Sequence, residues 1–234
     1  MVEILDGWDR TDARRHFLSV YSRTTEAFAE EIARGGFLDA GWIERFDVVF
    51  ADLYLDALTA WDTGRATPGP WRVAFETARD RPDLPALRHI LFGMNVHINY
   101  DLPQALLAVI TDGEFDDPTV TARRARDHEH ADTVLLARVA AEDTLIEGKK
   151  SLLDRILTPL NRAGTKRFVV EARQKVWRNA RALSLARREG PERLAGRIEE
   201  LDRLCAVRVA DLVAPGQVIL KLARRGFGVV LSDA

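Results

Sequence analysis

The chain has 234 residues, of which 47% are apolar and 30% charged, so it is long enough to bury one substantial core. Its net charge of -2 provides no overall basic field, and we expect no nucleic-acid partner. The single cysteine, Cys205, excludes an intramolecular disulfide and a multi-cysteine metal site, which fits a reducing compartment. Because the N-terminus lacks a signal-like pattern and no apolar run reaches about 18 residues, we expect a cytoplasmic protein.

Helical periodicity extends along the whole sequence. Ala, Leu, Arg and Glu dominate, apolar residues recur every three or four positions, and the alternation typical of strands is absent. These patterns predict an all-α, single-domain helical bundle over residues 1–234, with about eight or nine helices and a buried polar central helix. From residue 149 onward the predicted helices and the tail are rich in arginine.

The first predicted helix runs from about Asp12 to Arg34 and ends at two glycines. The second spans about residues 40–62, with Asp39 as its N-cap. A proline-containing turn follows, and then a short helix over residues 71–79.

Five polar residues interrupt the next predicted helix, which starts near Asp83 with that carboxylate as its cap. They are His89, Asn95, His97, Asn99 and Asp101. Buried polar groups cost several kcal/mol unless they have partners, so they indicate a polar network or a site. His97 and Asp101 lie one turn apart on one face, whereas Asn95 and Asn99 point about 160° away and must meet different neighbours.

Pro103 predicts a kink or break directly after Asp101, and Gly113 is expected to end the following helix. Asp117 predicts an N-cap before Pro118, opening a helix toward Gly148. The remaining predicted helices cover residues 149–162, 166–189 and 191–212.

The tail, residues 215–234, is predicted to be a short amphipathic or extended segment. Its mixed basic and apolar stretch, residues 220–227, could touch an anionic membrane surface or a partner. Alternatively, a last helix packs on the bundle through Val218, Ile219 and Leu222 while its arginines stay in solvent.

Motifs for phosphate loops, dinucleotides, serine hydrolases and His-Glu-x-x-His zinc sites are absent, and no Glu stands three residues before a His. What remains is His-x-x-x-Asp, which occurs as His97 with Asp101 and as His128 with Asp132. Two such pairs on antiparallel helices could hold a divalent metal such as zinc, which would activate water. The alternatives are that Asp101 caps the helix restarted by Pro103, and that residues 127–132 form a solvated face.

Four further residues are candidates for the same centre. Asp47 lies near the inner stripe of its predicted helix and could orient His97 or act as a ligand. Tyr54 and Tyr100 could add phenolic hydrogen bonds, although aromatic residues at this spacing are more often core. His89 could join His97, or it could be a partly buried histidine that donates to a neighbouring helix.

Three segments carry a resemblance to a known family. They are Asp47-Val48-Val49-Phe50-Ala51-x-x-Tyr54, Trp71-x-x-x-Phe75 and Gly93-Met94-Asn95-x-His97-Ile98-Asn99-x-Asp101-Leu102. They resemble the motifs of an uncharacterised family of all-helical bacterial proteins, a domain of unknown function, over roughly residues 10–190. That family often has a second histidine where this chain has Tyr100, and it implies a helical fold without an established activity.

A second likeness is confined to one helix. His97-x-x-x-Asp101-Leu102-Pro103-x-x-Leu106 is similar to a metal-binding stretch of the zinc-dependent phospholipase C and nuclease fold. In that fold an N-terminal amine and a tryptophan also bind zinc, and neither Met1 nor Trp8 matches them. The likeness therefore does not extend to a full three-zinc cluster.

The functional expectation is a small-molecule enzyme, such as a metal-assisted hydrolase. His97 and Asp101 would bind metal or act as acid and base, assisted by Asp47, while Asn95 and Asn99 would orient the substrate. The alternative is a non-catalytic ligand-binding or scaffold bundle whose polar network fixes helix register. An apolar surface with an exposed Phe37 and Leu38 would suit an apolar ligand or a homodimer.

Overall fold

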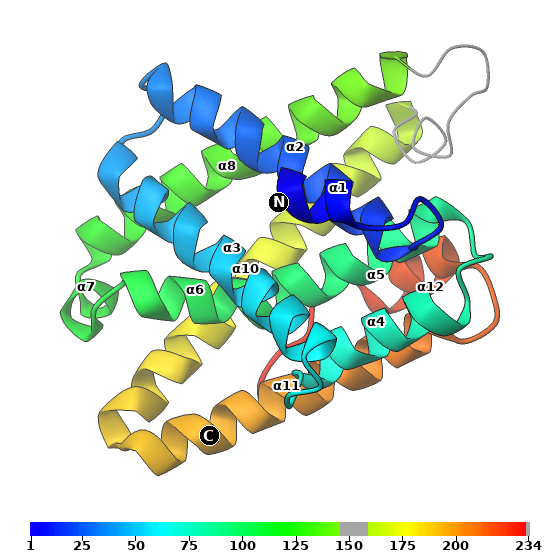
Figure 1. Cartoon of the computed structure of the whole chain (residues 1–234). Coiled ribbons are helices and arrows are strands. Elements are labelled where there is room, and N and C mark those ends of the chain that lie inside the picture. Colours follow the sequence, from blue (N-terminus) through cyan, green and yellow to red (C-terminus); the bar gives the residue numbers. More distant parts are fainter. Residues whose placement is uncertain (146–158, 233–234) are drawn as a thin grey trace.

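The computed structural model describes residues 1–145 and 159–232, with side chains described outside residues 135–169, 219 and 223. These parts of the chain contain helices and no strand, which confirms the all-α prediction (Figure 1). The helices are α1 (Val2–Gly7), α2 (Arg14–Ala33), α3 (Ala40–Asp62), α4 (Gly69–Asp80), α5 (Ala86–Val96), the π-helical turn η1 (His97–Asp101), α6 (Leu102–Val109), α7 (Asp112–Asp116), α8 (Pro118–Leu145), α10 (Pro159–Glu189), α11 (Pro191–Val213) and α12 (Val218–Arg225). Among the described residues their number slightly exceeds the expected eight or nine, because the short helices α1 and α7 were not predicted.

The strongest capping signals in the sequence act as predicted. The Asp39 carboxylate accepts a hydrogen bond from the Trp42 backbone N–H at 3.0 Å and starts α3. Asp117 accepts from the N–H groups of Thr119 and Val120 at 2.8 and 3.1 Å and starts α8. These local signals fix where two long helices begin.

The segment α5–η1–α6 runs through the middle of the bundle (Figure 1). On one side α5 packs against α2 and α4, and α6 packs against α3. On the other side α10 packs against α6, and α11 packs against α5 and η1. Polar residues on this segment are therefore enclosed by neighbouring helices on several sides.

A π turn replaces the break that Pro103 was expected to cause. Pro103 has no backbone N–H to donate, and its ring would clash with the carbonyl four residues earlier in a regular helix. The chain widens instead, so that the Leu102 N–H bonds to the carbonyl of His97, five residues back. The irregularity was predicted at the right place, but the helix continues in the same direction through it.

Three predicted boundaries were wrong. Asp83 does not cap α5, which begins at Ala86 after Pro85 without a side-chain cap. Gly113 lies inside α7, whose N-terminus is closed by a capping box between Thr111 and Glu114. The predicted helix at 149–162 falls mostly outside the described residues, but its end at residue 162 is wrong, because α10 continues through the expected break to Glu189.

Gly93 lets α2 approach α5 closely. A Cβ atom at this position would lie only 2.4 Å from a ring carbon of Phe17, well inside van der Waals contact. The Phe17 ring therefore rests directly on the backbone of α5, next to the polar residues that follow Gly93. This packing explains why a glycine stands at position 93.

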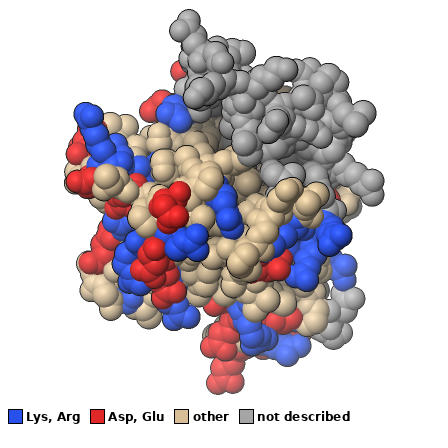
Figure 2. Space-filling model, turned by 90° about the vertical axis from the view of Figure 1, so that its right-hand side faces the viewer, with Lys and Arg blue, Asp and Glu red and all other residues tan. Residues whose placement is uncertain are grey.

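The molecular surface shows no single-sign field on the face drawn in Figure 2, where acidic and basic side chains are interspersed. Among the described residues, none of the helices combines the length and the apolar character needed to cross a bilayer. Phe37 is buried and stacks on Phe28, so the expected apolar surface pair is reduced to the exposed Leu38. α12 packs on the core through Val218 and Leu222, as the packing alternative predicted, while the side chain of Ile219 lies outside the described residues.

Candidate functional site

His97 and Asp101 form a hydrogen-bonded pair inside the bundle. The distance between His97 Nδ1 and Asp101 Oδ2 is 2.8 Å, and their side chains are 5% and 1% exposed. The same carboxylate oxygen accepts the indole N–H of Trp71 at 2.9 Å. Asp101 precedes α6, but its side chain makes no cap bond there, so its carboxylate serves His97 and Trp71 instead.

Aromatic rings enclose the imidazole of His97. The Phe50 ring lies parallel to it, with the ring centres 3.6 Å apart and the planes 7° from parallel. The Tyr21 ring meets it edge-on at 4.5 Å. Three further rings have their centres within 6.2 Å, and they belong to Phe17, Tyr54 and Trp71. The imidazole is thus held in one orientation, by the carboxylate at one nitrogen and by stacking on its face.

The other nitrogen of His97 has no hydrogen-bond partner among the described residues. His97 Nε2 is buried without a hydrogen bond, and so is the hydroxyl of the adjacent Tyr21. Because an ionised carboxylate only accepts hydrogen bonds, we assign the proton of the neutral ring to Nδ1, which leaves Nε2 as a bare acceptor. An unsatisfied buried polar group costs about 1–3 kcal/mol, so this atom is poorly explained by stability alone.

Burial shifts the pKa values of both partners, while the hydrogen bonds that Asp101 accepts favour its ionised form. Burial lowers the pKa of His97, against the opposing effect of the Asp101 carboxylate. It also raises the pKa of Asp101, which the hydrogen bonds from His97 and Trp71 partly offset. A neutral imidazole with a free nitrogen is the protonation state that a general base requires.

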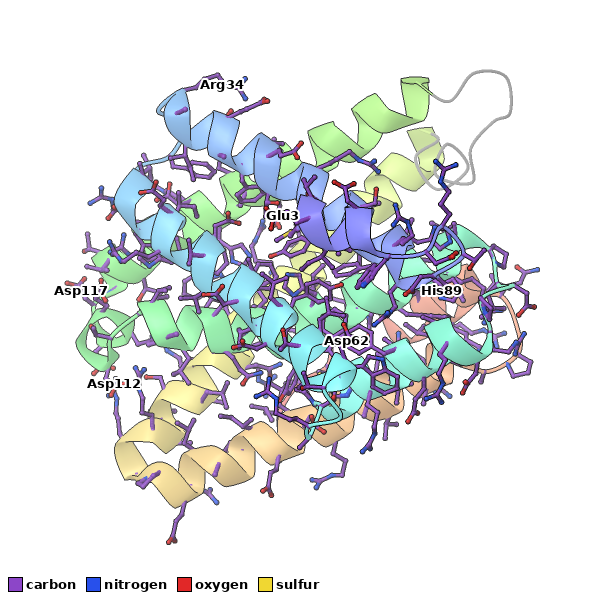
Figure 3. All side chains as sticks on the ribbon, in the orientation of Figure 1. Glu3, Arg34, Asp62, His89, Asp112 and Asp117 are labelled. Atoms are coloured by element: carbon purple, nitrogen blue, oxygen red, sulfur yellow. The ribbon has the colours of Figure 1, made fainter. Side chains whose placement is uncertain are left out.

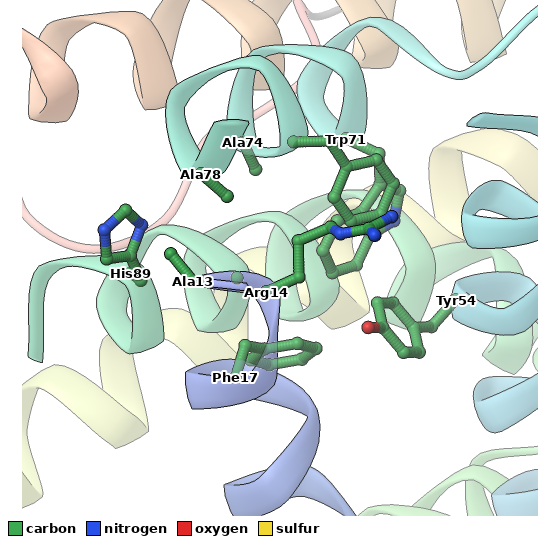
Figure 4. A pocket seen from close by; sticks show the side chains of 10 residues that line it. Ala13, Arg14, Phe17, Tyr54, Trp71, Ala74, Ala78 and His89 are labelled. Atoms are coloured by element: carbon green, nitrogen blue, oxygen red, sulfur yellow. The ribbon is translucent and has the colours of Figure 1, made fainter. Parts of the chain in front are cut away.

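A small recess lies beside this centre (Figure 4). Its volume of about 20 Å³ has room for about one water molecule. Phe17, Tyr54 and Trp71 form walls that it shares with the His97 centre, and in Figure 4 the Arg14 side chain lies between Trp71 and Phe17. Arg14 is ion-paired with Asp62 at 2.6 Å.

His89 lies at the far end of the recess from Tyr54, near the start of α5 (Figures 3 and 4). It stacks on His16 with the ring centres 5.8 Å apart, and its Nε2 atom is buried with no hydrogen-bond partner among the residues described. Burial lowers its pKa. His89 therefore borders the same recess as the walls of the His97 centre.

Asp47 and Tyr100 occupy different surroundings. Asp47 is half-buried on α3, its pKa is raised to about 6 by burial, and its charge contributes to the raised pKa of Tyr21. Asp47 is thus near the centre, although the structure gives it no hydrogen bond to His97. The pKa of the buried Tyr100 is raised by burial and by Asp202, which lies on the α11 side.

Asn95 and Asn99 face away from His97, as their spacing predicted. Both donate their side-chain amides to the backbone carbonyl of Phe227, at 3.0 and 3.1 Å. In this conformation they bind the C-terminal segment of the same chain. A substrate-orienting role for them stays a prediction.

The second His-x-x-x-Asp pair does not come together in the same way. His128 accepts a hydrogen bond from the Trp177 indole at 2.9 Å, whereas Asp132 pairs with Arg173 at 2.6 Å. Burial lowers the pKa of His128 to about 3. Asp127 is also buried and accepts from the backbone N–H of Leu38 at 2.7 Å.

The solvated-face interpretation of residues 127–132 was therefore wrong for Asp127 and His128, which are 1% and 3% exposed. Their side chains connect α8 to the backbone at Leu38 and to Trp177 on α10. Polar composition alone does not reveal which side of an amphipathic helix is covered.

A metal at His97 lacks a complete ligand set in the described structure. Among the described residues, no group of three or more His, Cys, Asp and Glu side chains is arranged to hold a metal ion. His97 Nδ1 and Asp101 Oδ2 are already bonded to each other, which leaves Nε2 as the nitrogen available to a metal. Structural zinc sites use four protein ligands and catalytic sites usually three, so the residues present do not fit such a site.

The contribution of Phe50, Tyr21 and Trp71 to the centre was not predicted from the sequence. Trp71 and Phe50 belong to the family-like motifs, and their helical spacing indicated core positions. Tyr21 lies on the inner stripe of α2, with no local signal for a polar role. Contacts among three separate helices could not be read from spacing within each helix.

Comparison with protein families identifies the chain as a member of a family of unknown function, DUF5995, whose model matches residues 1–215. This agrees with the expected uncharacterised helical family. Searches of curated proteins and of solved structures found no match.

Proposed function

We propose that this protein is a small-molecule enzyme in which His97 is the general base and Asp101 orients it. The observation that carries the proposal is the unpartnered Nε2 of His97, in a ring whose other nitrogen is fixed by a carboxylate. Asp–His pairs of this kind hold the tautomer in which Nε2 can accept a proton. Trp71 in turn fixes the carboxylate.

Hydrolysis is the reaction class that we favour. His97 Nε2 would take a proton from water as the water oxygen forms a bond to an electrophilic carbon or phosphorus of the substrate. The proton would then pass to the leaving group as its bond breaks, and Asp101 would stabilise the transient imidazolium. The water-sized recess is lined by Phe17, Tyr54 and Trp71 but not by His97, so this mechanism requires one of these rings to move before water reaches Nε2. No metal is required for these steps.

A scaffold role is the second candidate, and the sealed packing favours it. His97 and Asp101 are almost fully buried, Phe50 covers one face of the imidazole, and the recess is too small for an organic substrate unless side chains move. In that case the pair would fix the register of η1 against α4. The two candidates differ in whether a reagent can reach Nε2.

The test combines chemical access with activity. Diethyl pyrocarbonate reacts with neutral imidazole nitrogens, and mass spectrometry would locate the modified histidines in the folded protein. Enzyme function predicts modification of His97 at a rate above that of His128, which is buried and bonded to Trp177. A His97 that stays unmodified until the protein unfolds would support the scaffold.

The same preparation would be screened against small esters, phosphoesters and amides. We expect His97→Gln and Asp101→Asn to lower the turnover of any substrate found by about 10²–10⁴-fold while the fold persists. His130→Gln is the matched control, because His130 pairs with Glu31 at the edge of the bundle. Equal turnover by His97→Gln and the unchanged chain would reject His97 as the base.

The reducing, cytoplasmic setting inferred from composition is part of this proposal. Cys205 is buried as a free thiol, and burial raises its pKa well above the ordinary value. Such a thiol is poorly reactive. It needs no oxidising compartment for the fold to form.

A further inference from the structure

Residues 226–232 lie in an extended conformation against the bundle and are fixed by side chains from several helices. We call this segment the C-terminal strap. It follows α12, and Gly226, with φ of 73°, turns the chain from the helix into the extended segment. The strap lies beyond residue 215, where the match to the family model ends.

Two asparagines bind the backbone of the strap in a regular pattern. Asn99 donates to the Phe227 carbonyl and accepts from the Val229 N–H, both at 3.1 Å. Asn179 on α10 donates to the Val229 carbonyl at 3.1 Å and accepts from the Leu231 N–H at 2.9 Å. Each amide therefore bonds to the carbonyl of one residue and the N–H of the residue two positions later, as a neighbouring strand would.

Charged side chains bind further backbone groups of the strap. Lys175 donates to the Gly228 carbonyl at 3.2 Å, and Arg208 donates to the Gly226 carbonyl. At the far end Arg197 donates to the Ser232 carbonyl at 2.8 Å. Most of these contacts recognise the peptide backbone, whereas at Ser232 the side-chain hydroxyl is also bound, by Arg197 at 3.4 Å and Glu200 at 2.6 Å. The backbone contacts would accept another extended segment.

Every second side chain of the strap packs on the core. Phe227, Val229 and Leu231, two residues apart, pack on the hydrophobic core, and Leu231 is 3% exposed. This spacing is that of one face of an extended chain. The site thus selects apolar residues at every second position.

One acceptor in the site is left unused. Asn95 donates to Phe227, but its side-chain oxygen is buried and has no hydrogen-bond partner in the part of the chain that the structure describes; the residue itself is fully buried. A peptide that supplied a donor at this point would gain a bond that the strap lacks. The strap is therefore a good but incomplete occupant.

We propose that Asn95, Asn99 and Asn179 form a binding site for an extended peptide with apolar residues at alternate positions, which the C-terminal strap occupies in the free protein. Asn95 and Asn99 point away from His97, so this site is separate from the proposed catalytic centre. A negative result for the peptide site would therefore not bear on the catalytic proposal, and a negative result for catalysis would not bear on the peptide site.

Amide hydrogen exchange on the full chain tests the first half of the proposal. We expect Asn99→Ala to speed exchange of the Val229 amide at least 10-fold, and Asn179→Ala to do the same for Leu231. Gln104→Ala is the matched control, because the Gln104 amide bonds to the carbonyl of Tyr100 on the same central segment and does not touch the strap. Strap amides that exchange equally fast in all four proteins would overturn the proposal.

Binding in trans tests the second half. Full-length Val229→Pro lacks the backbone N–H that donates to the side-chain oxygen of Asn99, so its strap should detach and leave the site open. A fluorescein-labelled, acetylated peptide of residues 226–232 should bind this variant, should bind the unchanged chain at least 10-fold more weakly, and should not bind Val229→Pro combined with Asn99→Ala. A folded Val229→Pro that does not bind the peptide would overturn the proposal. If that variant does not fold, the exchange measurement decides.

Discussion

Trp71 donates its indole N–H to Asp101 across 2.9 Å, which connects α4 to the π turn at the centre of the bundle. The bond is completely buried, and it fixes the same carboxylate oxygen that holds His97. Through this contact the orientation of the imidazole depends on a helix that is distant in the sequence. Removal of the Trp71–Asp101 hydrogen bond should therefore lower the stability of the fold and loosen the orientation of His97.

Trp71→Phe keeps an aromatic ring but removes the donor. We expect the free energy of unfolding to fall by about 2 kcal/mol, because the hydrogen bond is made to a buried carboxyl group. Denaturant unfolding measures the loss. Trp61→Phe is the control, since Trp61 packs on the same Phe75 ring away from Asp101, and a larger loss there would contradict the assignment.

Asp47→Asn should stabilise the protein above pH 6. The folded-state pKa of about 6 exceeds the ordinary value of 3.8, so the folded state binds more protons between these values and stability falls as the pH rises through them. The variant lacks this penalty and should be more stable by about 1–2 kcal/mol at pH 8, with no advantage near pH 4. Asp52→Asn, at an exposed position on the same helix, should change little. Equal pH profiles for Asp47→Asn and the unchanged chain would contradict the prediction.

His128→Gln should reduce acid sensitivity. The His128 pKa is about 3 in the folded protein and near 6.5 when unfolded, so the unfolded state binds the extra proton and stability is lost as the pH falls from 6.5 toward 3. A glutamine can still accept the Trp177 N–H but does not titrate. We expect the stability of the variant relative to the unchanged chain to be about 2 kcal/mol greater at pH 4 than at pH 7. Unfolding curves at the two pH values would show it, and an unchanged difference would count against a buried neutral His128.

Gly93→Ala and Gly196→Ala should have opposite effects. An added methyl at Gly93 meets the Phe17 ring at 2.4 Å, so we expect a loss of about 1–3 kcal/mol. Gly196 is exposed on α11 with nothing within 4 Å of an added Cβ, so alanine there should stabilise by about 0.5–1 kcal/mol. Thermal unfolding of both variants is sufficient. Equal shifts in the same direction would reject the close approach of α2 to α5.

The position of the irregular turn shows how far the sequence could predict the centre. Pro103 lacks a donor, so a disturbed helix next to Asp101 followed from one residue. The sequence could not show that the chain would continue as a π turn, because that outcome depends on helices that pack on both sides of it. The pairing of His97 with Asp101 was predictable from their spacing, but the bond from Trp71 was not.

The asparagines show a different limit. Their spacing placed Asn95 and Asn99 on the face opposite His97, and this was correct. Their partner is the C-terminal strap, more than 120 residues away, as shown by the 128-residue separation of Asn99 and Phe227. Nothing in a local pattern specifies a contact of that range.

The sequence by itself determined the helical class, the start of the long helices at Asp39 and Asp117, and the two opposed polar faces of the central segment. These features depend on periodicity, capping and turn chemistry within a few residues. Only the tertiary structure decided that aromatic rings seal His97, that Asp127 and His128 are buried, and that the strap fills the asparagine site. The physical reason is that burial and hydrogen-bond satisfaction depend on which helices pack together, and packing partners are chosen over the whole chain.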